Sequence, residues 1–144
     1  MITSSLIWHN IKQLIPQRAP ILMVDELLGV EGEQALTCFT IRPENIFLDE
    51  EDRLEESGVI EHIAQSASAF AGYKAILVGA TEPPLGYIGE VKKFCCYHRP
   101  QVGERLLTTI TLGPEVNGVT LLTGQTHVGD ECVAETQMKI FIKA

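Results

Sequence analysis

The sequence predicts an α+β fold in which a mainly antiparallel sheet wraps around one long helix. Three observations lead to this prediction: one apolar segment long enough for a buried helix, two strand-like runs before it, and four strand-like runs after it. Strands that come in runs around a single helix are typical of this architecture. With 144 residues, 45% of them hydrophobic, the chain has the size and composition of a single domain spanning residues 1–144.

The first forty residues predict a short helical segment followed by a hairpin. Residues 6–15 are amphipathic, enough for one or two helical turns, and Pro16 and Pro20 bracket the turn that follows. Residues 21–30 are strongly apolar, and residues 35–41 alternate in the manner of a strand. The turn-like sequence between the two runs predicts that they pair as the strands of a hairpin.

The next segment is a polar loop that leads into the long helix. Residues 49–56 include six acids, so we expect a solvated loop. Ser57 is the candidate N-cap, and the acids before it complement the positive end of the helix dipole. We expect the helix to run from Gly58 to about Val78, with Gly79 ending it, and its mostly apolar surface predicts burial on most sides.

Four strands are expected after the helix. They cover residues 86–97, 105–112, 119–128 and 132–142. Glycine next to Glu, Asn or Asp marks the turns between them, because these residues tolerate turn backbone angles. In the last strand, alternation predicts that one face is formed by Ala134, Thr136, Met138, Ile140 and Ile142.

Charge and composition argue against several classes of function. With 11 Lys and Arg against 19 Asp and Glu, the formal net charge is −8, which repels nucleic-acid phosphates and anionic membrane surfaces. No apolar run approaches the ~20 residues of a membrane span and the N-terminus lacks a secretion-signal pattern, so we expect a cytoplasmic protein. The four cysteines have no metal-binding spacing, and we expect reduced thiols and no metal site.

One carboxylate stands out on the predicted helix. Glu61 lies in an otherwise apolar stretch that includes Val59, Ile60 and Ile63. Carboxylates are rarely buried without a partner, and one in an apolar cleft has its pKa raised by desolvation, which provides a general acid usable near neutral pH. A position on a wet edge of the helix would explain the same residue without any function.

Four segments, in order along the chain, resemble the β-hydroxyacyl-acyl carrier protein dehydratases of the hot-dog superfamily. They are Ile11–Asp25, Gly58–Gln65 with the sequence Gly-Val-Ile-Glu-His-Ile-Ala-Gln, Gly86–Phe94 and Arg99–Leu106. The chain is especially similar to the dehydratase-like subunits of aryl-polyene and flexirubin-type pigment clusters, which share the Glu-(aromatic or His)-Ile/Met-Ala-Gln start of the helix. The resemblance implies the hot-dog fold.

The resemblance also implies a reaction and the residues that perform it. In this family two subunits pair; a histidine removes the α-proton of a 3-hydroxyacyl thioester, and a carboxylic acid on the central helix of the partner subunit protonates the departing hydroxyl. Glu61 matches that acid. Gln65, one turn further on, shares its face and is expected to orient the carboxylate or bind substrate. Gly89 matches a position where the backbone passes close to the thioester, although a bulge would also explain a glycine in a strand.

The implied partners are an acyl carrier protein or a CoA thioester, and a second subunit in a homodimer or in a heterodimer with a related dehydratase. The substrate is then carried on phosphopantetheine, and no further cofactor is expected. Lys92 and Lys93 are candidate contacts for an acidic carrier protein, although two solvated lysines on opposite faces of a strand have the same sequence.

The chain departs from the family at the base. The family's histidine sits in a loop just before the central helix, and residues 47–58 contain no histidine. His62 is the nearest candidate base, but adjacent residues of a helix point about 100° apart, so it shares a pocket with Glu61 only with help from a dimer partner. Gln17 stands where the family often has another histidine. The remaining histidines are expected to be structural or exposed: His9, His98 and His127.

Three functions fit these observations. The first, which the residues favour, is an enzyme: a hydro-lyase of fatty acid or polyene biosynthesis that dehydrates 3-hydroxyacyl-carrier protein with Glu61 as acid. The second is a noncatalytic subunit that completes a heterodimeric dehydratase. The third is a hot-dog thioesterase, in which a helix carboxylate activates water. The shared fold does not separate them, because function depends on the site.

Overall fold

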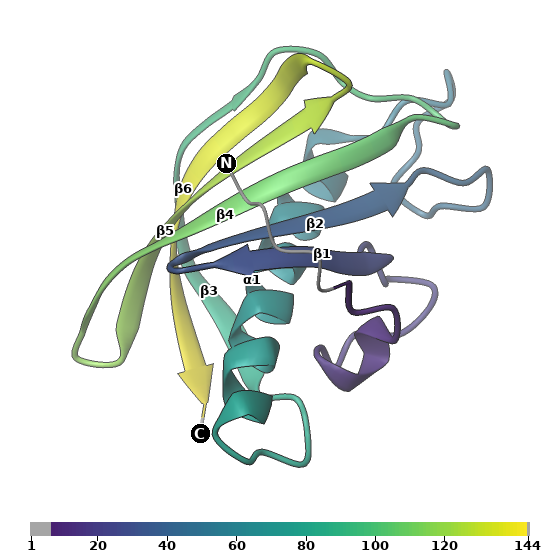
Figure 1. The fold of residues 1–144 in the computed structure, drawn as a ribbon. Coiled ribbons are helices and arrows are strands. Elements are labelled where there is room, and N and C mark those ends of the chain that lie inside the picture. Colours follow the sequence, from purple (N-terminus) through teal and green to yellow (C-terminus); the bar gives the residue numbers. More distant parts are fainter. Residues whose placement is uncertain (1–6, 144) are drawn as a thin grey trace.

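The computed structural model describes residues 7–143, apart from the side chains of Leu85, Ile142 and Lys143, and within that range it has six strands and one long helix. In chain order the elements are a 3₁₀ turn at Ile11–Gln13, β1 (Glu26–Glu31), β2 (Gln34–Thr40), α1 (Glu56–Leu77), β3 (Leu85–Cys96), β4 (Arg105–Val116), β5 (Val119–Val128) and β6 (Glu131–Lys143). The strands form one antiparallel sheet that curves around α1 (Figure 1). The predicted α+β arrangement is confirmed.

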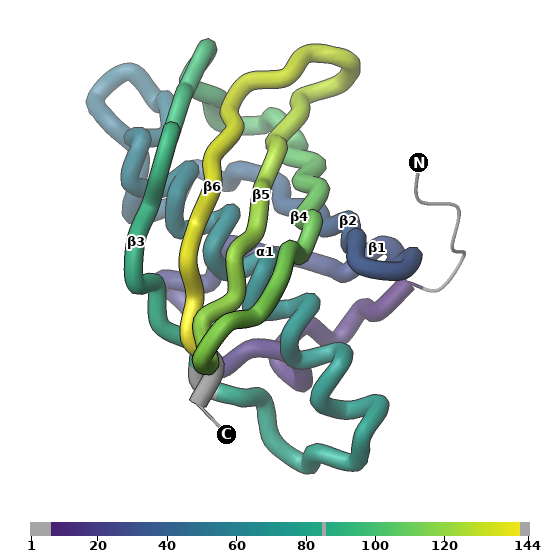
Figure 2. The backbone as a smooth tube through the Cα atoms, turned by 90° about the vertical axis from the view of Figure 1, so that its left-hand side faces the viewer, coloured from purple at the N-terminus to yellow at the C-terminus, as the bar shows by residue number. Residues whose placement is uncertain are grey.

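The strand order in the sheet is β1-β2-β4-β5-β6-β3, so the strand that follows the helix lies at one edge (Figure 2). β3 pairs with β6, and β1, at the opposite edge, pairs with β2. The backbone of β3 therefore has one side that no neighbouring strand of this sheet covers. Among the described residues no helix is long and apolar enough to cross a membrane.

The core lies between α1 and the concave face of the sheet. Val59, Ile63 and Phe70 of the helix are fully buried, and Leu106 and Ile110 of β4 are buried opposite them. The predicted common face of the last strand is confirmed for four of its residues, and the structure shows that this face is buried: Ala134, Thr136, Met138 and Ile140. The side chain of Ile142 lies outside the described part.

The first predicted strand is too long. Residues 21–25 are apolar enough for a buried strand, yet β1 begins only at Glu26. The backbone of Ile21 and Met23 bonds to a helix side chain: Gln65 accepts a hydrogen bond from the Met23 N–H at 2.6 Å and donates one to the Ile21 carbonyl at 2.8 Å. Sheet contact begins at Asp25, whose N–H donates to the Cys38 carbonyl of β2 at 2.8 Å. Burial of Met23 and Val24 without sheet pairing therefore explains the centre of the apolar run.

The helix starts earlier than predicted and with another residue at its N-terminus. It spans Glu56–Leu77, its N-cap is Glu55, and no side chain caps it. Ser57, the predicted cap, lies in the first turn and is exposed. The backbone N–H of Glu55 donates to the Phe47 carbonyl at 2.8 Å, which fixes the chain at the helix entry. At the other end Gly79 has a φ of 98°, as predicted for a residue that ends a helix.

The N-terminal segment is less helical than predicted and packs across the helix. A single 3₁₀ turn covers Ile11–Gln13, and Leu6 lies outside the described residues. The Leu14 carbonyl sits so close to Gly72 of α1 that a Cβ at residue 72 would overlap it. A glycine is therefore required at this crossing.

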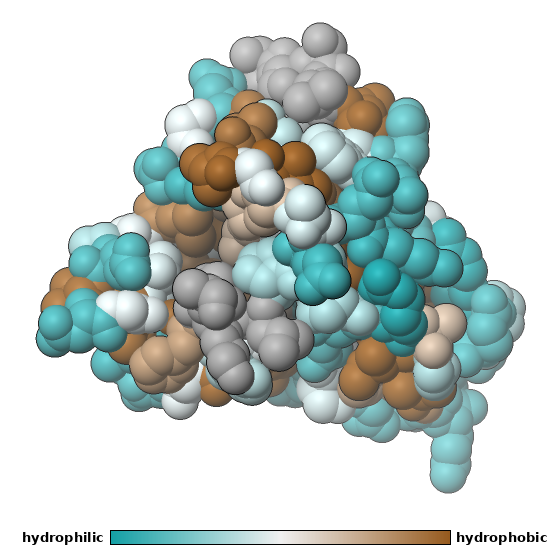
Figure 3. Space-filling model, turned by 90° about the horizontal axis from the view of Figure 1, so that it is seen from below, coloured by the Kyte–Doolittle hydropathy of each residue, from teal (hydrophilic) through white to brown (hydrophobic). Residues whose placement is uncertain are grey.

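The end of the molecule at the C-terminus of α1 displays hydrophobic residues among hydrophilic ones (Figure 3), in keeping with the high exposure of Leu77 and Val78.

Candidate active site

A cleft of about 250 Å³ lies between α1, the loop before β1 and the edge strand β3. The helix contributes Glu61, Ala64, Gln65 and Ser68. The spacing of these residues, three or four apart, places them on one face of the helix. The structure thus brings the two predicted helix residues of the site, Glu61 and Gln65, into the same cleft. The other lining residues are Gln17, Gly86, Tyr87, Ile88 and Ile140.

Gln65 is buried, and its amide holds the acid in place. Its Nε2 donates to Oε2 of Glu61 at 2.8 Å and to the Ile21 carbonyl at 2.8 Å. Its Oε1 accepts the Met23 N–H at 2.6 Å. Both hydrogens of the amide and its oxygen are therefore engaged within the chain. Gln65 thus hydrogen-bonds to the Glu61 carboxylate, which fits the first of its two predicted roles, orienting that carboxylate.

Glu61 is half-buried and only one of its carboxyl oxygens is held. Oε2 accepts the hydrogen bond from Gln65, and within residues 7–143 no group donates a hydrogen bond to Oε1. A carboxyl group that lines a cleft and is fixed through one oxygen is able to exchange a proton with a bound molecule through the other.

His62 lies on a different side of the helix from Glu61. It is fully buried, its Nδ1 donates to the Met23 carbonyl at 2.7 Å, and its Nε2 accepts from the Thr108 hydroxyl at 2.7 Å. Thr108 is in turn bonded to the hydroxyl of Thr126 at 2.7 Å. Burial lowers the pKa of His62 from 6.5 to about 4, so the ring is neutral near neutral pH. This geometry gives His62 a structural role and does not support the expectation that it is the base.

The other three histidines lie outside the Glu61 cleft. His9 is exposed and pairs with Glu26. His98 is exposed in the loop after β3, and His127 is partly buried on β5. The structure therefore brings no histidine of residues 7–143 to the carboxyl group of Glu61.

The loop that replaces the family's histidine loop is anchored more firmly than predicted. Leu54 is fully buried, and Asp49 accepts hydrogen bonds from the Glu51 and Arg53 N–H groups and from Arg99 at 2.7 Å. These bonds, led by that from Arg53, lower the pKa of Asp49. Only part of this acidic segment is a solvated loop, because its ends are fixed to the rest of the fold.

Gly89 lies at an irregular point of β3 and not in the Glu61 cleft. The pairing of β3 with β6 shifts register between Ile88 and Glu90, which marks a bulge. A Cβ at Gly89 would lie 2.5 Å from the ring of Phe141. The structure thus explains this glycine by the bulge and by the aromatic ring, whereas Ile88, just before it, does line the cleft.

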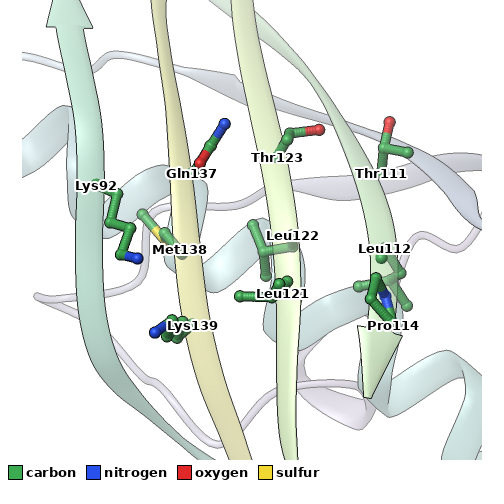
Figure 4. Close-up of a pocket in the computed structure, with 11 residues that line it drawn as sticks. Lys92, Thr111, Leu112, Pro114, Leu121, Leu122, Thr123, Gln137, Met138 and Lys139 are labelled. Atoms are coloured by element: carbon green, nitrogen blue, oxygen red, sulfur yellow. The ribbon is translucent and has the colours of Figure 1, made fainter. Parts of the chain in front are cut away.

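A larger groove of about 460 Å³ crosses strands β3, β6, β5 and β4 (Figure 4). Lys92, Gln137, Thr123 and Thr111 form a row of cross-strand neighbours along it. Its titratable lining residues are lysines, so it offers no carboxyl group and no imidazole for acid–base chemistry. Lys93, the residue after Lys92, has a φ of 51° at the point where the pairing of β3 with β6 shifts register a second time. Side chains of β3 therefore do not alternate regularly at these two lysines.

Sequence reasoning gave Gln17 no role in the site. Its side chain lines the Glu61 cleft, and its Oε1 is buried without a hydrogen-bond partner among the described residues. The only signal in the sequence was its position, where related dehydratases often have a histidine.

Among residues 7–143 there is no cluster of three or more His, Cys, Asp and Glu side chains that could hold a metal ion.

Solved structures share this architecture. The dehydratase heterocomplex ApeI:P from Xenorhabdus doucetiae matches with a TM-score of 0.85 at 14% identity, over 93% of this chain and 91% of that chain. The PaaI protein of the phenylacetic acid degradation operon of E. coli matches with a TM-score of 0.64 at 8% identity, over 80% of each chain. An antiparallel sheet wrapped around a central helix is the hot-dog fold, as the sequence predicted.

Comparison of sequences identifies the family. Residues 9–144 match the model of the ApeP-like family, described as ApeP dehydratase. The 3-hydroxyacyl-acyl-carrier-protein dehydratase FabZ of Natranaerobius thermophilus is 31% identical over 134 residues, which cover 90% of this chain and 92% of that protein. The chain therefore belongs to the ApeP-like dehydratase family, and the resemblance inferred from the sequence is confirmed.

Proposed function

We propose that this chain is a subunit of a dehydratase that removes water from a 3-hydroxyacyl thioester, with Glu61 as the general acid. The observation that supports this most is the carboxyl group itself, which lines the cleft and is fixed by Gln65 through Oε2, while no described group donates to Oε1. In the reaction a base takes the proton from the α-carbon, the bond from the β-carbon to oxygen breaks, and Glu61 supplies the proton with which the hydroxyl leaves as water. An α,β-unsaturated thioester remains.

We further propose that a second chain supplies the base. A supporting observation is that none of the four histidines lines the Glu61 cleft, and that His62 is engaged at both nitrogens. The cleft is bounded by the edge strand β3, where another subunit has access. ApeI:P, which has the same fold, is a heterocomplex. The proposed assembly is therefore a heterodimer with a related dehydratase that carries the family's histidine.

The proposed substrate is an acyl group bound to phosphopantetheine, on an acyl carrier protein or on CoA. The support is the relative named FabZ, which acts on acyl carrier protein substrates by its name, and the family to which this chain belongs. No other cofactor is part of the proposal. The exposed lysines Lys92 and Lys93 are a candidate contact for the acidic carrier protein.

A thioesterase is the second candidate, and one observation favours it. A carboxylate without a histidine beside it is able to activate water for attack on the thioester carbon, a reaction that needs no base at the α-carbon. The products then differ from those of dehydration, because the carbon to sulfur bond breaks and a free thiol is released while the 3-hydroxyl is retained.

The test is a product assay on 3-hydroxyacyl-carrier protein, with the chain alone and mixed with a histidine-bearing dehydratase of the same family. The proposal predicts an enoyl thioester in the mixture and none from the chain alone. Free thiol from the chain alone would identify the thioesterase. Enoyl product from the chain alone would contradict the proposal that a second chain supplies the base.

A further inference from the structure

The cleft beside Glu61 contains a polar atom that nothing in the described chain satisfies. Oε1 of Gln17 is buried and accepts no hydrogen bond from residues 7–143. Most buried polar atoms of native proteins have a partner, so an exception requires an explanation. Gln17 lines the cleft together with Glu61. A ligand that occupies the cleft is able to supply the missing donor.

The two polar groups of the cleft that contact each other, Gln65 and Glu61, do not donate to Gln17. The amide of Gln65 uses both of its hydrogens, one for the Ile21 carbonyl and one for Glu61. Glu61 carries a hydrogen only in its protonated form, and as a general acid it gives that proton to the ligand. Ser68 and Tyr87 also line the cleft, but within residues 7–143 neither hydroxyl donates to Oε1 of Gln17. A bound ligand is therefore able to supply this donor.

The loop that carries Gln17 is fixed by its neighbour. The guanidinium of Arg18 donates to the carbonyls of Ile15 at 2.7 Å, of Gln17 itself at 2.9 Å and of Lys12 at 3.1 Å. These bonds tie the backbone of residues 12–18 into one arrangement. Gln17 thus presents its acceptor from a backbone that is already ordered, which lowers the cost of orienting a ligand.

We propose that Gln17 is a positioning residue that accepts a hydrogen bond from the 3-hydroxyl group of the bound acyl thioester. A hydroxyl donates one hydrogen and keeps two lone pairs. When its hydrogen is held by Oε1 of Gln17, a lone pair is left to take the proton of Glu61. No covalent bond changes at Gln17. The inference rests on the proposed function for the class of ligand, and it adds the group that recognises the hydroxyl.

The experiment measures binding and not turnover. The probes are 3-hydroxyhexanoyl and hexanoyl pantetheine amides, in which nitrogen replaces the thioester sulfur and elimination is suppressed. Titration calorimetry with the protein in the oligomeric form in which it is purified should give about tenfold tighter binding of the hydroxylated probe, the value of one neutral hydrogen bond. Gln17→Met, of similar length but without an acceptor, should lose this preference.

Gln125→Met is the matched control, because Gln125 is exposed on β5, away from the cleft, and this variant should keep the preference. Removal of a buried acceptor without a partner should also raise the Tm of the ligand-free Gln17→Met protein by roughly 3 °C, which shows that the variant is folded. A Gln17→Met protein that still prefers the hydroxylated probe by tenfold would overturn the proposal.

Wild-type protein provides a second measurement if the variant does not fold. A 3-fluorohexanoyl pantetheine amide has a substituent of similar size that donates no hydrogen bond, and it should bind about tenfold more weakly than the hydroxylated probe. Equal affinities would contradict the proposal. Since neither measurement requires turnover, a preference that depends on Gln17 supports the inference even if no dehydration is detected.

Discussion

Glu61 and His62 are adjacent in the chain, and each is held by contacts of a different kind. Glu61 reaches the cleft and is bound by Gln65. His62 is buried against the sheet and joins the Met23 carbonyl to the Thr108 hydroxyl. Each end of the imidazole thus fixes a separate part of the fold to α1. Through these two hydrogen bonds His62 helps to hold in place the helix that carries Glu61.

His62 should make the stability of the fold depend on pH. Its pKa is about 4 in the folded chain and 6.5 when unfolded. As pH falls below 6.5 the unfolded chain binds the proton first, so stability that is complete above pH 6.5 is lost progressively toward pH 4. The free energy of unfolding should fall by about 3 kcal/mol between pH 7 and pH 4 through this group.

Urea unfolding of wild type and His62→Gln over that range is the check on this residue. Glutamine keeps a donor and an acceptor but does not titrate, so the variant should lose less stability on acidification. Equal pH dependence of the two proteins would show that the buried histidine is not responsible.

At the residue scale, spacing predicted some contacts and missed others. Glu61 and Gln65 are four apart on a helix, so their contact followed from the sequence. The partners of His62 are Met23 and Thr108, which are 39 and 46 positions away and meet only in the folded chain. Local periodicity carries no information about such neighbours, which is why His62 remained a candidate base until its surroundings were visible.

At the scale of elements, the helix and the last four strands were predicted to within a few residues, because their periodicity and turns are regular. The errors lie where tertiary contacts replace local signals. Residues 21–25 resemble a strand in composition, but the backbone of Ile21 and Met23 bonds to the Gln65 side chain, and contact with β2 starts only at Asp25. Ser57 resembles an N-cap, but the bond from Glu55 to the Phe47 carbonyl starts the helix earlier.

The crossing of the N-terminal segment over α1 makes a prediction for the helix. Gly72→Ala would place a methyl group where the Leu14 carbonyl lies, so the segment must move away. We expect a loss of about 3 kcal/mol in the free energy of unfolding despite the better helix propensity of alanine.

Ser57→Ala, in the first turn of the same helix, is the control and should change stability by less than about 0.5 kcal/mol, because Ser57 is exposed and does not cap the helix. Guanidinium unfolding of both variants measures the difference. A neutral Gly72→Ala would mean that the N-terminal segment does not pack on α1 as described.

At the scale of the whole molecule, the site lies at the border of the sheet. β3 is an edge strand, and two of its large apolar side chains that line the cleft are exposed, Tyr87 at 53% and Ile88 at 42%. Exposed apolar residues on an unprotected edge strand favour association with another chain. The Glu61 cleft thus borders a strand edge on which a second subunit could pack and complete the site.

We propose that Glu61 is the acid and that another chain supplies the base. The most direct test replaces the acid of one chain at a time by glutamine in the mixture of this chain with a histidine-bearing dehydratase. Glu61→Gln in this chain should reduce the rate of enoyl formation at least 100-fold, because a general acid contributes about 10²–10⁴ in rate. The same substitution of the corresponding acid in the histidine-bearing chain should leave the rate nearly unchanged. The opposite pattern, with Glu61→Gln active and the other variant inactive, would contradict the account and leave this chain a noncatalytic subunit.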